Sequence, residues 1–349
     1  MNNLFPISRG RLPVALLLVL VLLVAAACGG GTTQTPAATE VPAEAPAEEA
    51  AEAPVEEAAE APAEEPAAGT QIVVDSTGAE VEVPLNPQRV VALSERDMDA
   101  AFALGVPLVG VVNGRGAQTP PAYLQSYLGD AVSVGAFSEP SPEAILNLNP
   151  DLILIGGMFP ELEAMLPSFR EIAPVFVTFN SGDDWRLAFQ NAAYGLNRTA
   201  EAEAWLADYD ARAADLAGKL PAGDEVSIVR FNPDGPVIMA PASFASTIVT
   251  SLGLTRPEGQ MSIEGQGHGD TVSLEAISAI DADHIFVGAL NPEGTAVLDA
   301  ALANPLYGAL QAVQNDAVSV VDGAVWTSLG GPLAAQVVLD NVAAAFGAQ

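Results

Sequence analysis

The sequence predicts an α/β protein with two Rossmann-like lobes joined by one long, rigid α-helix, and two observations lead to that prediction. Residues 141–157 recur without gaps as residues 273–289, and seven of 17 positions are identical. Strand-like and helix-like segments also alternate on both sides of a Gly-poor helical stretch at residues 184–220. The repeats start 132 residues apart, far beyond the roughly 20 to 50 residues of a solenoid period. We therefore expect two similar lobes with a ligand cleft between them.

Each copy of the repeat has the pattern of a short helix, a turn and a buried strand. Ser141 and Ser273 stand at the helix N-cap position, and Glu143 and Glu275 fall in the first turn. An acidic side chain there stabilises the helix dipole without any partner. A continuous aliphatic run follows in each copy and ends at a glycine, which is typical of a strand in a buried sheet.

Residues 1–28 have the pattern of an export signal. Arg9 and Arg11 precede an uncharged apolar run at residues 14–27, and three alanines then precede Cys28, the single cysteine of the chain. Cys28 resembles the lipidated N-terminal cysteine of a bacterial lipoprotein. We expect a lipoprotein signal peptide and a membrane anchor through a lipid on Cys28. An ordinary secretory signal containing an incidental cysteine is the alternative.

Residues 29–69 are dominated by alanine, proline and glutamate and contain an octad at residues 47–54 that recurs at residues 55–62. A segment of this composition cannot build a core, so we predict a disordered tether. Residues 1–69 hold two arginines and ten glutamates, and residues 70–349 hold ten basic and 34 acidic residues, which divides the net charge of −32 into −8 and −24. This acidity makes nucleic acid an unsuitable partner. We expect a monomer.

The folded region divides into three parts. In an N-terminal lobe, residues 70–183, a hairpin at 71–83 precedes strands at 89–93, 108–112, 151–155 and 175–179. Residues 184–220 come next. Their apolar residues recur at near-helical spacing, which predicts a connecting helix with a bend near Gly195 and Asn197. A C-terminal lobe, residues 221–349, has strands at 227–231, 237–240, 284–287 and 318–321.

Ligands of open α/β sheets bind beyond the carboxyl ends of the strands. Because the folded region holds few basic residues, an arginine at a strand end is informative. The candidates that follow a strand are Arg96, Arg115, Met158, Arg230, Phe231 and Trp326.

Several short motifs, in this order and spacing, resemble the substrate-binding proteins of ABC importers for ferric siderophores, haem and vitamin B12. They are Pro-Gln-Arg-Val-Val-Ala-Leu at 87–93, Val-Gly-Ala-Phe at 134–137, Val-Arg-Phe-Asn-Pro-Asp-Gly at 229–235, Pro-Ala-Ser-Phe-Ala at 241–245, and Trp326 with Gly-Gly-Pro-Leu-Ala-Ala at 330–335. The resemblance covers roughly residues 70–347. It implies capture of a ligand and its delivery to a permease dimer whose ATPase supplies the energy.

The resemblance also implies roles for individual residues. Glu143 and Glu275 match the lobe-tip glutamates that pair with permease arginines. Trp326 and Phe137 match aromatic side chains of the ligand cleft. Phe244, within the 241–245 motif, and His268, in a Gly-rich loop, are further candidate contacts. Gly269 stands where the B12-binding member has an aromatic residue, which makes cobalamin a less suitable ligand.

A ferric siderophore saturates its iron with six oxygens, so the protein needs no metal ligand and no cofactor. Arg230 would donate its planar fork to ligand oxygens. Three converging arginines would suit an anionic catecholate, whereas one arginine with Trp326 and Phe137 would suit a hydroxamate, which we favour. Haem is the main alternative, although it wants an axial ligand and the only histidines are His268 and His284.

An enzyme is the alternative from a different class of function. The sequence holds no Gly-x-Ser-x-Gly motif and no candidate Ser-His-Asp set for a tethered hydrolase. We therefore expect a binding protein that is not an enzyme, located outside the cytoplasm and held at a membrane by its lipid.

Overall fold

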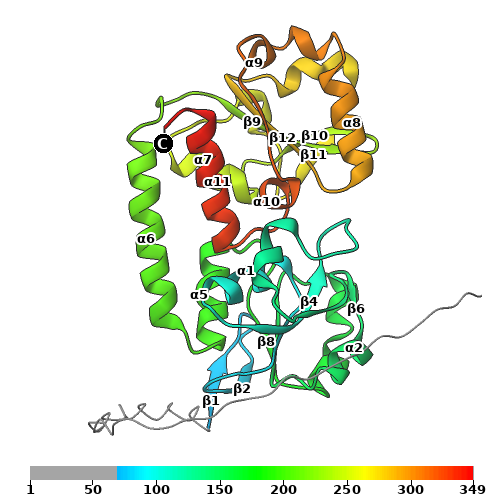
Figure 1. Cartoon of the computed structure of the whole chain (residues 1–349), viewed down its shortest axis with the longest axis vertical. Coiled ribbons are helices and arrows are strands. Elements are labelled where there is room, and N and C mark those ends of the chain that lie inside the picture. Colours follow the sequence, from blue (N-terminus) through cyan, green and yellow to red (C-terminus); the bar gives the residue numbers. More distant parts are fainter. Residues whose placement is uncertain (1–68, 349) are drawn as a thin grey trace, which may run out of the picture. The chain divides into compact units, whose positions relative to one another are not determined.

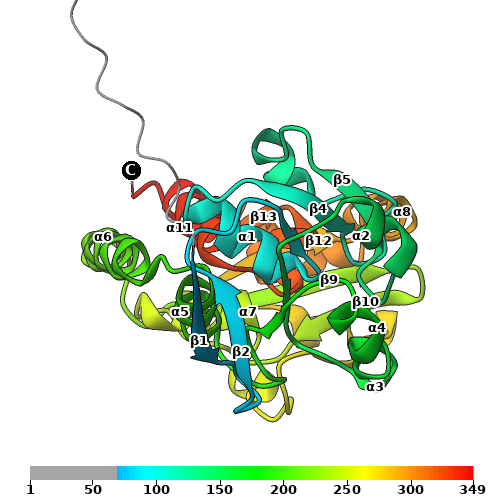
Figure 2. The ribbon, with the colours of Figure 1, turned by 90° about the horizontal axis from the view of Figure 1, so that it is seen from below.

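The computed structural model describes residues 69–348 (Figure 1). The predicted signal peptide, Cys28 and nearly all of the predicted tether lie outside the described residues. Within residues 69–348, every helix is too short or too polar to cross a lipid bilayer. The described part contains a two-stranded hairpin and two larger sheets, each covered by helices (Figures 1 and 2).

The first lobe is built on a six-stranded sheet with the order β6-β5-β4-β3-β7-β8, in which every neighbouring pair except β5 and β6 is parallel. The strands are β3 (Val90–Ala92), β4 (Leu108–Asn113), β5 (Val132–Ala136), β6 (Glu139–Pro140), β7 (Leu152–Ile155) and β8 (Val175–Val177). The hairpin is β1 (Thr70–Val74) with β2 (Glu80–Pro84). The predicted hairpin and the four predicted strands are confirmed. The edge strands β5 and β6 were missed, because most of their residues are exposed and show no apolar pattern.

The helices of the first lobe follow its strands. They are α1 (Glu95–Ala103), η1 (Ala122–Tyr127), α2 (Pro142–Asn147), α3 (Pro160–Glu163) and α4 (Leu166–Arg170). Ser94 caps α1 by accepting a hydrogen bond from the backbone N–H of Asp97 at 3.0 Å. Ser141 caps α2 in the same way through Ala144. The repeated phrase therefore forms the helix, turn and buried strand that its pattern predicts.

The second lobe is built on a five-stranded sheet with the order β11-β10-β9-β12-β13. The strands are β9 (Val226–Asn232), β10 (Gly235–Met239), β11 (His268–Thr271), β12 (His284–Ala289) and β13 (Val318–Val320). Strands β9, β12 and β13 are parallel, whereas β10 and β11 pair antiparallel. The second copy of the repeat forms η3 (Leu274–Ile280) and β12, so its short helix is a 3₁₀ helix.

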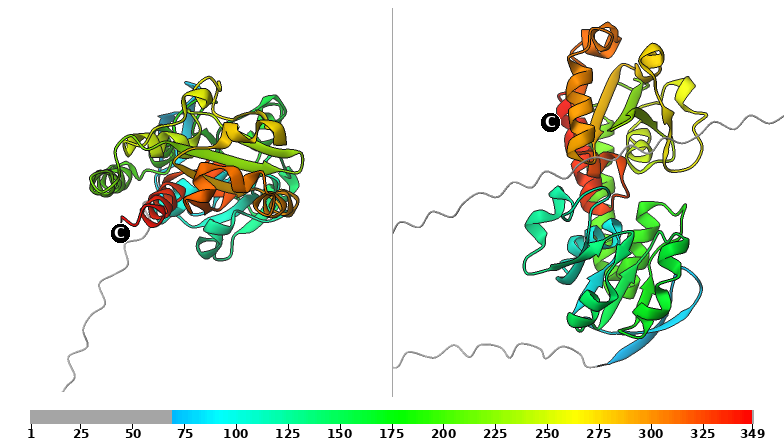
Figure 3. Two further views of the ribbon diagram at one scale, coloured as in Figure 1. Left: turned by 90° about the horizontal axis from the view of Figure 1, so that it is seen from above. Right: turned by 90° about the vertical axis from the view of Figure 1, so that its right-hand side faces the viewer.

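The remaining helices pack around the second sheet, as the views in Figure 3 show. They are α7 (Phe244–Ser251), η2 (Glu258–Gln260), α8 (Pro292–Leu302), η4 (Tyr307–Ala309), α9 (Gln311–Gln314), α10 (Gly323–Thr327) and α11 (Pro332–Ala345).

The connecting segment does not form one long, rigid helix, and the break falls where the sequence predicts a bend, near Gly195 and Asn197. The segment forms two helices, α5 (Trp185–Gly195) and α6 (Thr199–Ala217), and α6 follows as a separate rod (Figure 1). Asn197 adopts the left-handed region with a φ of 56°, which ends the first helix. Its side-chain amide donates to the backbone oxygen of Leu85 at 3.1 Å and thereby holds the break against the first lobe.

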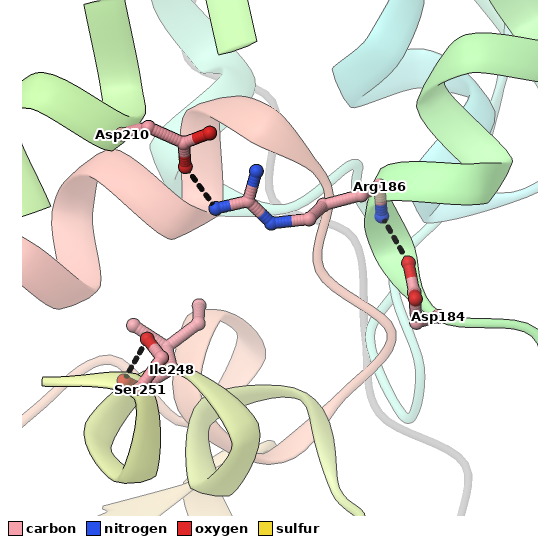
Figure 4. A network of polar contacts seen from close by, with 5 residues as sticks. All are labelled: Asp184, Arg186, Asp210, Ile248 and Ser251. Carbon is pink, nitrogen blue, oxygen red and sulfur yellow. Dashed lines mark hydrogen bonds and ion pairs between the residues drawn. The ribbon is translucent and has the colours of Figure 1, made fainter. Parts of the chain in front are cut away.

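Helices α5 and α6 are joined by side chains as well as by the chain (Figure 4). Asp184 caps α5 by accepting a hydrogen bond from the backbone N–H of Arg186 at 2.7 Å. The guanidinium group of Arg186 forms an ion pair with Asp210 of α6 and lies 5.0 Å from the ring centroids of Trp185 and Tyr209. Both charged groups are partly exposed, so the stacking on buried rings matters more than the ion pair.

The two lobes meet where α1 contacts the α10–α11 loop (residues 328–331) and the start of α11. Arg96 donates to the backbone oxygen of Gly330 at 3.1 Å. Asp99 accepts hydrogen bonds from the backbone N–H groups of Gly331, Leu333 and Ala334 at 3.3, 2.6 and 3.0 Å. The Asp99 carboxylate of α1 thus pairs with backbone N–H groups at the start of α11 that have no acceptor within that helix.

Asp99 is fully buried, and it also accepts a hydrogen bond from the hydroxyl of Tyr123 at 2.9 Å. Burial raises the pKa of Asp99 to about 6, and the hydrogen bonds from Ala334, Leu333, Tyr123 and Gly331 oppose that rise. Asp99 therefore stabilises the junction of the lobes, because it accepts hydrogen bonds from four donors that its removal would leave unpaired.

We predict that Asp99→Ala lowers the free energy of unfolding by about 2–4 kcal/mol, because it leaves several buried donors without a partner. Urea unfolding at pH 7 measures this change. Asp208→Ala is the control, because Asp208 is exposed on α6 and its removal should cost less than about 0.5 kcal/mol. Equal midpoints for the two variants would contradict the role of Asp99.

Candidate ligand-binding site

A small pocket of about 40 Å³ lies at the carboxyl ends of the strands in the first sheet. Its walls come from the segments after β3, β4, β5 and β7, together with the α10–α11 loop. The lining residues are Leu93, Ser94, Glu95, Arg115, Phe137, Gly156, Gly157, Phe159, Leu162 and Leu329. This is the place where the sequence predicts ligand contacts, because parallel strands end together at one edge of a sheet.

Arg115 and Phe137 are brought together in this pocket. The guanidinium carbon of Arg115 lies 4.7 Å from the centroid of the Phe137 ring. Phe159 packs edge-on against the same ring at 6.2 Å. Arg115 is exposed, and Phe137 is half-buried. The ring therefore orients a cation that is still accessible to a ligand.

Arg230 approaches from the second lobe, at the end of β9. Its Nε donates to the Oδ1 of Asn232 at 3.1 Å, and a terminal nitrogen donates to the backbone oxygen of Thr327 at 3.2 Å. Only 8% of its surface is exposed. Burial lowers the pKa of Arg230, and the charge of Arg115 lowers it further.

Neither arginine of this pair has an acidic partner within ion-pair distance in residues 69–348. Burying a cation without an opposite charge is costly. Arg115 lines the pocket, and its charge acts on Arg230, which is not among the lining residues. Each guanidinium presents parallel N–H donors, which suit oxygen-rich anions.

Glu95 is a site residue that the sequence reasoning missed. It stands in the first turn of α1 and is 7% exposed. Its Oε1 accepts a hydrogen bond from the backbone N–H of Arg115 at 2.6 Å, and its Oε2 accepts one from the hydroxyl of Ser328. Burial raises the pKa of Glu95, while the two hydrogen bonds and the charge of Arg115 oppose the rise. The sequence feature that could have identified Glu95 was its position directly before Arg96, at the end of a predicted strand.

Arg96 corrects one expectation. Its guanidinium donates to the backbone oxygens of Gly330 and Asp183, both at 3.1 Å, and stacks over Phe179 at 4.7 Å. Burial lowers its pKa to about 10. With 3% of its surface exposed, Arg96 joins the lobes instead of reaching toward a ligand.

Three predicted aromatic contacts also lie in the core. Trp326 is fully buried, stacks on Phe286 at 4.1 Å and donates its indole N–H to Asn341 at 2.9 Å. Phe231 is fully buried beside Tyr307, and Phe244 is 7% exposed. The residues around Trp326 form the short helix α10, whose buried face carries the indole ring. The expectation that these three rings line the cleft is wrong.

Met158 and His268 keep accessible positions. Met158 is half-buried beside the pocket residue Gly157. His268 is exposed on the edge strand β11. The preceding Gln266 donates its side-chain amide to the backbone oxygen of Gly182 at 2.9 Å and so links this loop to the first lobe. A ligand role for Met158 and His268 stays a prediction.

Glu143 and Glu275 are exposed in the first turns of α2 and η3, one on each lobe. Residues 69–348 contain no group of three or more histidine, cysteine or acidic side chains placed to hold a metal ion. A larger hollow of about 820 Å³ lies beside α7, and its lining includes none of the predicted site residues.

The chain is similar to known binding proteins. Residues 90–324 match the family described as periplasmic binding protein. The probable siderophore-binding lipoprotein YfiY of Bacillus subtilis is 31% identical over 285 residues, which cover 78% of this chain and 86% of that protein. The Fe(3+)-citrate-binding protein YfmC of the same organism is 29% identical over 269 residues, covering 75% and 81%.

The fold is also similar to a solved structure. The crystal structure of Staphylococcus aureus SirA complexed with staphyloferrin B matches with a TM-score of 0.68 and 24% identity, and the match covers 80% of this chain and 99% of that one. This likeness establishes a common two-lobed fold.

We predict that Trp326→Ala lowers the free energy of unfolding by about 3–5 kcal/mol, because a buried indole leaves a large cavity. Trp205→Ala is the matched control, since Trp205 is only half-buried on α6. Chemical unfolding of both variants measures the difference. A loss for Trp326→Ala no larger than that for Trp205→Ala would contradict the core position.

Proposed function

This chain belongs to the periplasmic binding protein family, and from that premise we propose that it captures a ferric siderophore outside the cytoplasm and delivers it to the permease of an ABC importer. Relatives with this function are binding proteins, not enzymes, and their ligands are cargo. The iron would arrive with its coordination shell already filled by the chelator, so the protein has to recognise the outer surface of the complex.

The single observation that carries the proposal is that Arg115, which lines the pocket, and Arg230, on which its charge acts, form no ion pair with an acidic side chain in residues 69–348. Citrate-type and catecholate chelators present anionic oxygens around the iron. A guanidinium fork binds such oxygens through parallel, charge-assisted hydrogen bonds. The guanidinium groups of Arg115 and Arg230, from different lobes, would bind one anionic complex. The negative charge of the complex would offset the repulsion between the two cations.

These two arginines change the preferred ligand class. The preference for a hydroxamate rested on one arginine with Trp326 and Phe137. Trp326 is in the core, and the charge of Arg115 acts on a second arginine, Arg230. We therefore propose an anionic ferric chelate, and the relative named as Fe(3+)-citrate-binding supports this choice.

The pocket of about 40 Å³ is far below the roughly 300–1,000 Å³ of a typical ligand site. We infer that it receives one arm of the chelate and that the complex lies above it, between the lobes. Admission of the ligand then requires the Arg115 loop or the lobes to move apart. The contacts of α1 with the α10–α11 loop would limit that motion to small angles.

Haem or cobalamin is a weaker alternative. Haem would want an axial ligand, and His284 is 6% exposed inside β12 with its ring hydrogen-bonded to Ser319. His268 is exposed but belongs to the edge strand β11. Both remain alternative ligands because the family includes metal-chelate binders, but the paired arginines favour an anion.

We also propose that Cys28 carries a lipid and that residues 29–69 tether the folded part to a membrane. The relative named as a lipoprotein supports the anchor. Glu143 and Glu275 would contact arginines of the permease dimer, whose ATPase drives import. Complementary charges at two separate points set the orientation and the rate of docking.

We predict that Arg115→Ala and Arg230→Ala each raise the Kd for ferric citrate by roughly 10- to 100-fold, because each removes a charge-assisted contact. Isothermal titration calorimetry on the full chain measures the constants. Arg170→Ala is the control, since Arg170 is exposed on α4 outside the pocket lining. If all three variants weaken binding equally, general charge and not the site attracts the ligand.

The failure of the proposal itself has a separate signature. A wild-type chain that gives no saturable heat with ferric citrate, ferric catecholates, ferric hydroxamates, haem or cobalamin would show that the ligand class is wrong.

The docking role makes a different prediction. Reversal of both charges, Glu143→Arg with Glu275→Arg, should abolish uptake of radioactive iron by cells while leaving the Kd within about twofold, since neither residue lines the pocket. Glu161→Arg, an exposed reversal on α3, is the control. Docking through these two residues is refuted if the control loses as much uptake or if the double variant loses ligand affinity.

A further inference from the structure

Glu95 is the one acidic side chain among the residues that line the pocket. Glu95 and Arg115 both line this pocket, and only 7% of the surface of Glu95 is exposed. A buried carboxylate beside a site for anions needs an explanation, because its negative charge opposes the ligand that the arginines attract.

The position of the Glu95 carboxylate is fixed from both lobes. The backbone N–H of Arg115, in the first lobe, donates to Oε1 at 2.6 Å, and the hydroxyl of Ser328, in the α10–α11 loop, donates to Oε2. A Cβ atom at Gly114 would lie 3.3 Å from Oε1, so the loop before Arg115 closes directly over the carboxylate. The Arg115 loop and Ser328 together fix the orientation of the Glu95 carboxylate in this structure.

The charged groups that face Glu95 are few. Arg115 stabilises its negative charge and Asp322, at the start of α10, opposes it. The phenol of Tyr123 senses the charges of both Glu95 and Asp99. Arg115, Arg230 and an ionised Glu95 together carry a net charge of +1, and of these three Arg115 and Glu95 line the pocket.

We propose that Glu95 sets the charge of the ligand that the site accepts. This inference rests on the proposed function, because it concerns the same site and an anionic ferric chelate. Ionised Glu95 balances one of the two arginines, so the site favours chelates of low negative charge over highly charged ones. Glu95 acts as a specificity residue, and its contacts with Arg115 and Ser328 keep its charge at a fixed distance from the ligand.

The experiment compares two ferric complexes of different charge, a trianionic ferric tris-catecholate and a neutral ferric trihydroxamate, by calorimetry on the full chain. Glu95→Gln keeps the shape of the side chain and removes its charge. We expect the affinity ratio of tris-catecholate to trihydroxamate to rise by about tenfold or more, since one unit of nearby charge acts only on the charged ligand. Glu161→Gln removes one negative charge from the exposed surface of α3, outside the pocket lining, so it should leave the ratio unchanged.

Arg115→Gln provides an independent variant. It lowers the charge of the site by one and should shift the ratio in the opposite direction, and the double variant Glu95→Gln with Arg115→Gln should return to the wild-type ratio. An unchanged ratio in Glu95→Gln, or a ratio in the double variant that does not return, overturns the inference while the proposed function stands. A wild-type chain that binds neither complex nor ferric citrate overturns the proposed function itself.

Discussion

The contact between helix α1 and the α10–α11 loop determines how the two lobes meet, and the candidate site depends on it. Arg115 follows β4 of the first sheet and Arg230 lies in β9 of the second, so neither sheet alone holds them together. Arg96, Asp99 and Glu95 bridge the gap through hydrogen bonds to residues 328–334. These three side chains are buried. Their hydrogen bonds pair with polar groups of residues 328–334 that would otherwise lack a partner.

The site is a local exception in an acidic protein. Residues 70–349 carry a net charge of −24, yet the pocket and its surroundings present two arginines against one glutamate. Salt screens exposed charges beyond about 8–10 Å, so the acidic surface has little effect on a ligand within the cleft. Recognition of an anion then depends on short-range contacts with the guanidinium groups, which explains why burial of Arg230 and the stacking of Arg115 on Phe137 matter.

Local patterns in the sequence predicted the local structure well. The cap at Ser141, the buried strands and the repeated phrase follow from residue spacing, and the structure confirms the two α/β lobes. Ser273 stands at the predicted N-cap position, but its side chain makes no hydrogen bond to the helix. The place of the break between α5 and α6 was predicted as a bend, but the full interruption of the helix was not, because it depends on Asn197 adopting a left-handed conformation and reaching Leu85 in another element. Trp326 was misplaced because the Gly-rich composition around it conceals the short helix α10 and its stacking on Phe286. Arg115 and Arg230 were singled out from their places near strand ends, and their contact with a ligand stays a prediction. Glu95 was not, because its importance comes from Ser328, which lies 233 residues away in the chain.

The most direct test of the central claim is a crystal structure of the chain with ferric citrate bound. The account predicts that carboxylate oxygens of the complex lie within hydrogen-bonding distance of the guanidinium groups of both Arg115 and Arg230, with Glu95 still holding the Arg115 loop and Ser328. A complex seated in the hollow beside α7, or one that contacts neither arginine, would contradict it.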